Sequence, residues 1–208
     1  MFDVDGTIVQ SNDIDNECYI ESVKEVIGIT PDKCWSNYEN ITDSGILSEI
    51  LLKENVIGEY RDIMNKVKNI YITKLNKRIS QDCIIEVPGA SEFIDYLHSR
   101  KDVVLSIATG GWFESAILKL RFAGIEFKNI PIASSNDHYS KAEIMRIAES
   151  RSLKNMVASN TYFGDSEYDK NASEDLGYNF ILVGNSIVHD KRISDFTSIN
   201  EVMLHIYS

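Results

Sequence analysis

The sequence has few cysteines and no long apolar run, and each scarcity excludes a class of protein. Three scattered cysteines, Cys18, Cys34 and Cys83, do not suit a disulfide framework or a zinc site, and they predict reduced thiols in a cytoplasmic protein. No apolar segment approaches the roughly 20 residues of a membrane span. The first residues also lack the basic and apolar regions of a signal peptide.

Positive charge is also scarce, whereas apolar residues are not. The chain has 21 Lys and Arg against 32 Asp and Glu, a net charge of −11, which argues against nucleic acid or an anionic membrane as the main partner. Of its 208 residues, 43% are hydrophobic and 25% are charged, as in ordinary folded domains. We therefore expect one domain, or one domain with an insertion, that buries a sizeable core.

From about residue 86 onward, short apolar runs alternate with helical patterns. The runs cover residues 103–108, 130–133, 161–164 and 180–183. Because the runs are continuous, they predict strands buried on both faces, and their alternation with helices predicts a parallel α/β sheet. Helices are expected over 111–123 and 166–177, and from residues 140 and 198 onward.

Residues 12–82 show a different pattern, which we call the helical insertion. Helices are predicted over 12–27, 31–39, 44–54 and 59–78, and no strong strand signal is present. The sequence thus predicts an α/β core formed by residues 1–11 and 83–208, interrupted by this insertion. An insertion placed after the first strand would lie at the carboxyl end of the sheet, where open α/β folds bind ligands.

Two pairs of aspartates stand where predicted strands end. Asp3 and Asp5 lie in FDVDGTIV, and Asp165 and Asp169 lie in YFGDSEYD. Carboxylates this close repel unless a cation holds them or one is protonated, and such oxygen ligands suit a hard cation such as Mg²⁺. The ordinary alternatives are a turn rich in Asp and Gly, and a helix capped by Asp165 with a solvated Asp169.

Two further positions could bind an anion. Thr109 follows the run 103–108 and precedes Gly110 and a second glycine, so a hydroxyl and free backbone N–H groups would be available. Lys141 opens a predicted helix, where a cation opposes the helix dipole unless an anion is near. A capping threonine and a solvated lysine are the ordinary alternatives.

Taken in order, these four pieces resemble the motifs of the haloacid dehalogenase superfamily of phosphotransferases, over nearly the whole chain. The order is Asp3-Val4-Asp5-Gly6-Thr7, then Thr109, then Lys141, then Gly164-Asp165 to Asp169. The segments 42–45 and 87–90 are also similar to phosphoglycolate-phosphatase-like members. The resemblance implies a Rossmann-like parallel sheet core with an inserted all-helical C1 cap, which is the helical insertion.

The resemblance also implies a Mg²⁺-dependent phosphatase that hydrolyses a small phosphorylated metabolite through an aspartyl-phosphate. Asp3 would be the nucleophile and Asp5 the general acid and base. The substrate phosphate would be held by Thr109, Gly110 and Lys141. Mg²⁺ would be held by Asp3, Asp5, Asp165 and Asp169. A sugar phosphomutase, or a non-catalytic protein that binds a phosphometabolite, would carry the same residues and stays an alternative.

Several expectations concern the surroundings of this site. The resemblance places the segment before Asp3 at the sheet centre, between the strands that end at Thr109 and Asp165. Only Met1 and Phe2 precede Asp3, so this first strand is expected to be truncated and to pair incompletely. Four other residues are expected either near the substrate or in ordinary packing and capping roles: Trp35, Tyr38, Thr42 and Asp43.

Overall fold

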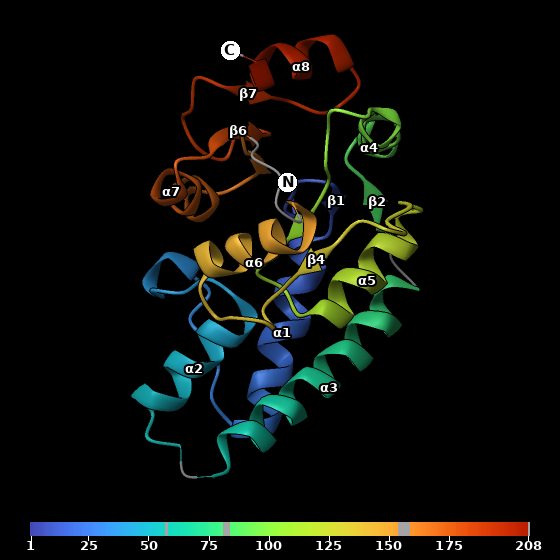
Figure 1. Cartoon of the computed structure of the whole chain (residues 1–208). Coiled ribbons are helices and arrows are strands. Elements are labelled where there is room, and N and C mark those ends of the chain that lie inside the picture. The colour runs from blue at the N-terminus through green and yellow to red at the C-terminus, as the bar shows by residue number, and fades with distance from the viewer. Residues whose placement is uncertain (57, 81–83, 154–158, 208) are drawn as a thin grey trace.

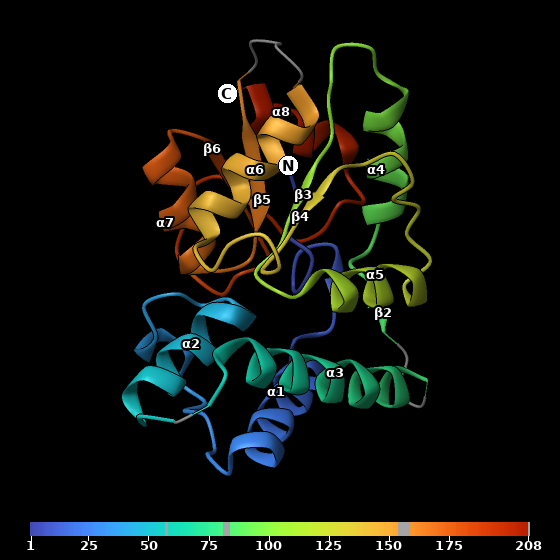
Figure 2. The ribbon, with the colours of Figure 1, turned by 60° about the horizontal axis from the view of Figure 1, so that its bottom comes forward.

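The computed structural model describes residues 1–56, 58–80, 84–153 and 159–207. Most of its strands belong to a parallel sheet (Figures 1 and 2). On one side β5 (Thr161–Gly164) pairs with β6 (Asn179–Val183), and β6 pairs with β7 (Arg192–Ile193). On the other side β3 (Ile107–Ala108) pairs with β4 (Ile132–Ala133). All of these pairings are parallel, as the continuous apolar runs predict.

Phe2 joins the two groups of strands. It forms parallel bridges to Ile107 on one side and Phe163 on the other. The Phe2 N–H donates to the Ser106 carbonyl oxygen at 3.0 Å, and the Phe2 carbonyl accepts from the Ala108 N–H at 2.9 Å. The segment before Asp3 thus lies between the strands that end at Thr109 and Asp165, and this order carries Asp3 to the same sheet edge as both.

Helices cover both faces of the sheet (Figure 2). On one face, α6 (Lys141–Leu153) and α7 (Glu167–Leu176) pack their apolar residues in a cluster with Tyr162 of β5. On the other face, α4 (Ala90–Ser99) and α8 (Ile199–Tyr207) pack in a cluster that contains Phe163. Adjacent strand residues point to opposite faces, so β5 contributes Tyr162 and Phe163 to different clusters.

Three helices gather at the carboxyl end of the sheet, together with α5 (Phe113–Phe122) (Figure 2). They are α1 (Asn12–Ile27), α2 (Asp43–Lys53) and α3 (Tyr60–Ile79). On α3, Val67, Tyr71 and Leu75 are buried, and their i, i+4 spacing places them on one stripe of the helix. These helices therefore stand where a ligand above the sheet would be enclosed.

Two segments connect the sheet to these helices, one before α1 and one after α3, and the two segments pair with each other. β1 (Val9–Gln10) runs antiparallel to β2 (Ile85–Glu86). The sequence does not predict this ribbon, because each strand has only two residues and neither has an alternating pattern. The predicted boundary between residues 82 and 83, and Cys83 itself, lie outside the described residues.

Some predicted elements differ from the structure. The helix predicted over 31–39 is wrong: this segment contains only a 3₁₀ turn, η1 (Trp35–Asn37). The Asp32 carboxylate accepts hydrogen bonds from the Cys34 N–H at 2.9 Å and the Asn37 amide at 2.6 Å, and such local bonds compete with a helix. The strands predicted over 103–108 and 130–133 are limited to their last two residues, where their neighbours pair.

Within the described residues, none of the helices combines the length and apolar character that crossing a bilayer requires.

Candidate active site

A cavity of about 380 Å³ lies between the carboxyl end of the sheet and the helices α1 and α2. The sheet side of the cavity is formed by Asp3, Asp5, Thr109, Gly110, Gly111, Lys141, Asp165, Ser166, Glu167, Tyr168 and Asp169. Its opposite side, which we call the helical side, is formed by Asp15, Asn16, Tyr19, Trp35, Ile41, Thr42, Asp43 and Ile46. The seven residues with predicted catalytic, phosphate-binding or metal-binding roles all line this one cavity: Asp3, Asp5, Thr109, Gly110, Lys141, Asp165 and Asp169.

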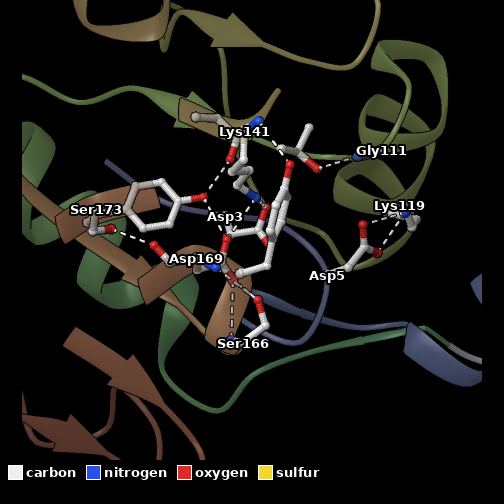
Figure 3. Close-up of polar contacts among 12 residues, drawn as sticks. Asp3, Asp5, Gly111, Lys119, Lys141, Ser166, Asp169 and Ser173 are labelled. Atoms are coloured by element: carbon white, nitrogen blue, oxygen red, sulfur yellow. Dashed lines mark hydrogen bonds and ion pairs between the residues drawn. The ribbon is translucent and has the colours of Figure 1, made fainter. Parts of the chain in front are cut away.

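Lys141 joins two of the aspartates at the sheet side (Figure 3). Its Nζ lies 2.8 Å from Asp3 Oδ1 and 2.9 Å from Asp169 Oδ1. Lys141 is the first residue of α6, and all three side chains are buried. The interpretation of Lys141 as a solvated surface residue is therefore wrong, because a buried ammonium at this position is compensated by two carboxylates.

The charges in this group perturb one another. Burial raises the pKa of Asp3 from 3.8 to about 7; Lys141 acts against this shift, whereas Asp169 and Asp5 add to it. Burial alone would lower the pKa of Lys141, but Asp169 and Asp3 raise it well above its ordinary value. Lys141 thus stays charged, and its positive charge opposes the upward shift of the Asp3 pKa.

Three carboxylates converge at this place. Ligand oxygens of Asp3, Asp165 and Asp169 all lie within 4.8 Å of one another. Gly164 allows the approach, because a Cβ built there would lie 2.6 Å from the Asp169 Cβ. Side-chain oxygens gathered this closely form a set that suits a hard divalent cation.

Asp169 is held in place from the start of α7. Ser166 is the N-cap residue and its hydroxyl accepts from the Asp169 N–H at 3.2 Å, while it donates to Asp169 Oδ2 at 2.7 Å. The alternative in which Asp165 caps this helix and Asp169 is solvated is therefore wrong. A reciprocal capping box needs a short hydroxyl side chain at the first position, which Ser166 supplies.

Thr109 and the two glycines after it follow the end of β3. The Thr109 hydroxyl accepts from the Gly111 N–H at 3.1 Å, so it stabilises the turn as well as lining the cavity. The Gly110 carbonyl accepts from the Asp43 N–H at 2.9 Å. A Cβ at Gly110 would lie 3.1 Å from the Ile41 carbonyl oxygen, so this turn sits tightly beneath the segment that leads into α2.

Asp5 belongs to a second group of charges, which the sequence does not reveal (Figure 3). Lys119 Nζ on α5 lies 2.6 Å from an Asp5 carboxylate oxygen and 2.8 Å from Asp15 Oδ1. The hydroxyls of Ser11 and Tyr71 donate to Asp5 and Asp15, respectively. This group links the sheet side of the cavity to α1, α3 and α5.

A signal for Lys119 is nevertheless present in the sequence. On α5 the buried residues are Ser115, Ala116, Lys119 and Leu120, so the lysine lies on the buried stripe of the helix. Burial alone would lower the pKa of Lys119, but Asp15 and Asp5 raise it. A lysine in an apolar helical stripe thus indicates a buried carboxylate partner, although the pattern does not say which one.

Four residues on or near the helical side were predicted with two alternative roles. Trp35 lines the cavity, whereas Tyr38 packs against Trp35 with ring centroids 6.1 Å apart and is not among the lining residues. Thr42 serves in both roles, because it lines the cavity and its hydroxyl caps α2 by accepting from the Gly45 N–H at 3.0 Å. Asp43 also lines the cavity, and its carboxylate accepts from the Trp112 N–H at 2.7 Å.

Comparison with known proteins gives one family match. The family model for haloacid dehalogenase-like hydrolases matches residues 1–183. No curated protein sequence matches the chain.

Many solved structures share the fold. CbbY from Rhodobacter sphaeroides, solved in complex with phosphate, has a TM-score of 0.71 at 17% identity, over 100% of this chain and 97% of that one. A hydrolase from Pseudomonas syringae has a TM-score of 0.70 at 17% identity, over 98% of this chain and 88% of that one. A HAD hydrolase from Entamoeba histolytica has a TM-score of 0.70 at 17% identity, over 100% and 98%, respectively.

Proposed function

Since the chain belongs to the family of haloacid dehalogenase-like hydrolases, we propose that it is a Mg²⁺-dependent phosphatase acting on a small phosphorylated metabolite. The observation that carries this proposal is the convergence of Asp3, Asp165 and Asp169, with their oxygens within 4.8 Å, in a cavity that also contains Asp5. The structure of the Rhodobacter sphaeroides protein in complex with phosphate is consistent with this chemistry.

The residues fit a divalent cation. Burial, and to a lesser extent the neighbouring carboxylates, raises the pKa of Asp3 to about 7, so a cation placed among these oxygens would stabilise its ionised form. We propose that Asp3, Asp165 and Asp169 hold Mg²⁺ with the Asp5 backbone carbonyl. Bound Mg²⁺ would supply positive charge for the phosphoryl oxygens.

Asp3 is proposed as the nucleophile. Its carboxylate oxygen would attack phosphorus, the bond from phosphorus to the alcohol oxygen would break, and an aspartyl-phosphate would form. Lys141, at 2.8 Å, orients the Asp3 carboxylate and offsets part of its charge, so that an anionic substrate can approach.

Asp5 is proposed as the acid and base. It lines the same cavity as Asp3 and would donate a proton to the departing alcohol oxygen. In the second half of the reaction it would take a proton from the water that attacks the aspartyl-phosphate, which releases inorganic phosphate and restores Asp3. Lys119 and Ser11 fix the direction of the Asp5 carboxylate through direct hydrogen bonds.

Thr109, Gly110 and Lys141 are proposed to hold the phosphate. They line the sheet side of the cavity beside Asp3, and they offer a hydroxyl, a backbone N–H and an ammonium. A phosphate oxygen that accepts from these groups would leave phosphorus facing the Asp3 carboxylate. In this arrangement the helical insertion, residues 12–82, acts as a cap that encloses the organic part of the substrate.

The test is hydrolysis of p-nitrophenyl phosphate by the full chain, with Mg²⁺ and with a chelator. We expect phosphate release that depends on Mg²⁺ and is lost in Asp3→Asn, with circular dichroism showing that the variant remains folded. Activity that persists in Asp3→Asn, or that ignores chelation, would contradict the proposal. A phosphomutase would instead move phosphate between positions of a sugar phosphate and release little inorganic phosphate.

A further inference from the structure

Both sides of the cavity carry carboxyl groups, and among the described residues the sheet side adds one ammonium. The sheet side holds the proposed metal ligands and Lys141, whereas the helical side carries the carboxyl groups of Asp15 and Asp43, the Asn16 amide and aromatic and aliphatic side chains. Among the described residues that line the cavity, Lys141 is the single Lys, Arg or His. It is already bound to Asp3 and Asp169, at 2.8 and 2.9 Å.

The nearest cation behind the helical side is Lys119, and it is also committed. Its side chain is fully buried, it does not line the cavity, and it bridges Asp5 and Asp15 at 2.6 and 2.8 Å. To meet an anion in the cavity, Lys119 would have to leave two carboxylates that are themselves largely buried. Such a break is strongly unfavourable, because it leaves uncompensated charge in the interior.

Among the described residues that line the cavity, a second anionic group on the substrate would therefore find no uncommitted cation to pair with. It would lose its hydration on entering the cavity and would face the carboxyl groups of Asp15 and Asp43, while the cation beside Asp15, Lys119, stays bound to its two carboxylates. Hydroxyl groups fit better, because they can donate to these carboxyl oxygens and accept from the Asn16 amide. The rings of Tyr19 and Trp35 offer an apolar surface to carbon atoms of the substrate.

We propose that the substrate is a phosphate monoester whose organic part is a polyol or sugar without a second phosphate or carboxylate. This inference rests on the function proposed above and adds the chemical class of the group that leaves. Its basis is the distribution of charge over the helical side, where carboxyl, amide and aromatic groups are the polar and ring partners available to the substrate.

The test compares matched pairs of compounds as competitive inhibitors of p-nitrophenyl phosphate hydrolysis by the full chain with Mg²⁺. One pair is glycerol 3-phosphate and 3-phosphoglycerate; the first has a hydroxymethyl group where the second has a carboxylate. The second is fructose 6-phosphate and fructose 1,6-bisphosphate. We expect the inhibition constant of the singly phosphorylated, non-carboxylate member to be lower by about tenfold or more in each pair.

A gain-of-charge variant tests the cause. Asn16 is half-buried on α1 and lines the helical side. Asn16→Lys should shift the ratio of inhibition constants toward the anionic member of each pair by about tenfold, whereas Asn16→Gln, the uncharged control of similar length, should leave the ratio within about twofold. Because the readout is a ratio, a general loss of activity in either variant cancels.

The outcomes separate the two proposals. Loss of all Mg²⁺-dependent, Asp3-dependent hydrolysis of p-nitrophenyl phosphate would refute the proposed function. An active enzyme that binds the anionic members as well as or better than the others refutes only the substrate class. The substrate class alone is also refuted if glycerol 3-phosphate and fructose 6-phosphate fail to compete, or if Asn16→Lys leaves the ratio of inhibition constants unchanged.

Discussion

Replacing Lys119 with methionine should destabilise the protein strongly. Methionine is close to lysine in length and fills the same space, so the change mainly removes a buried ammonium. Lys119 is fully buried, and its two partners, Asp5 and Asp15, have side chains that are 18% and 15% exposed. The variant leaves two adjacent, largely buried carboxylates without a cation.

The expected magnitude follows from this geometry. Removing one partner from a buried ion pair typically costs about 3–5 kcal/mol. For a chain of this length, about 2–4 °C of melting temperature corresponds to 1 kcal/mol, so the melting temperature should fall by about 6–20 °C. Exposed pairs contribute only about 0–1 kcal/mol. Lys128→Met, which removes a lysine whose side chain is 83% exposed, is therefore the matched control.

Urea unfolding followed by circular dichroism measures both variants on the full chain. Adding Asp15→Asn to Lys119→Met should recover part of the lost stability, because one of the two carboxylates is then neutral; a double-mutant cycle gives this coupling energy. The reasoning about this buried group is wrong if the free energy of unfolding of Lys119→Met lies within about 1 kcal/mol of the wild-type value. It is also wrong if Asp15→Asn destabilises the Lys119→Met variant by as much as it destabilises wild type.

Four further predictions concern the site and the buried Thr7. Without metal, burial raises the pKa of Asp3 from 3.8 to about 7, so between these pH values the native state holds a proton that the unfolded state releases. The free energy of unfolding of wild type, relative to Asp3→Asn, should therefore fall as pH rises from 3.8 to about 7. A rise over this range, measured by urea unfolding, would contradict this. Calorimetry should also show weaker Mg²⁺ binding below that upper pKa, because the ligand must lose its proton. Gly164→Ala would place a Cβ 2.6 Å from the Asp169 Cβ, so the Asp169 side chain would have to move. The variant should therefore bind Mg²⁺ about 10–100-fold more weakly in the same titration. Unchanged affinity would show that Asp169 tolerates displacement. The Thr7 hydroxyl is fully buried and has no hydrogen-bond partner among the described residues. Thr7→Val should therefore leave stability unchanged or raise it by up to about 2 kcal/mol in thermal unfolding. A clear loss of stability would contradict this prediction.

The α/β part of the fold was largely predictable because its signals are local. The continuous run at 161–164 is β5 without change, and the helix expected over 166–177 is α7, which ends before Gly177 with its left-handed backbone. The segment at 31–39 was misread because the side chain of Asp32 competes with helical hydrogen bonds, and helical periodicity does not reveal that competition. The ribbon of β1 and β2 was missed because its pairing joins residues that are far apart in the chain.

The gathering of Asp3, Lys141, Asp165 and Asp169 was also predictable, although their contacts were not. Each follows or adjoins the carboxyl end of a parallel strand, and parallel strands bring these ends to one edge. The sequence could not show that Lys141 contacts both Asp3 and Asp169, because the order of residues along the chain does not specify side-chain directions. Capping by Ser166 rather than Asp165 was likewise decided by local geometry.

By itself the sequence therefore determined the family, the parallel sheet and the set of acidic groups at its edge, because these depend on short runs and on the order of motifs. Only the tertiary structure decided which side chains enclose the organic part of a substrate and which cations are already committed. Lys119 of α5, Asp15 of α1 and Tyr71 of α3 meet across long stretches of chain. Such meetings depend on how helices pack over the sheet, which hydrophobic periodicity alone does not specify.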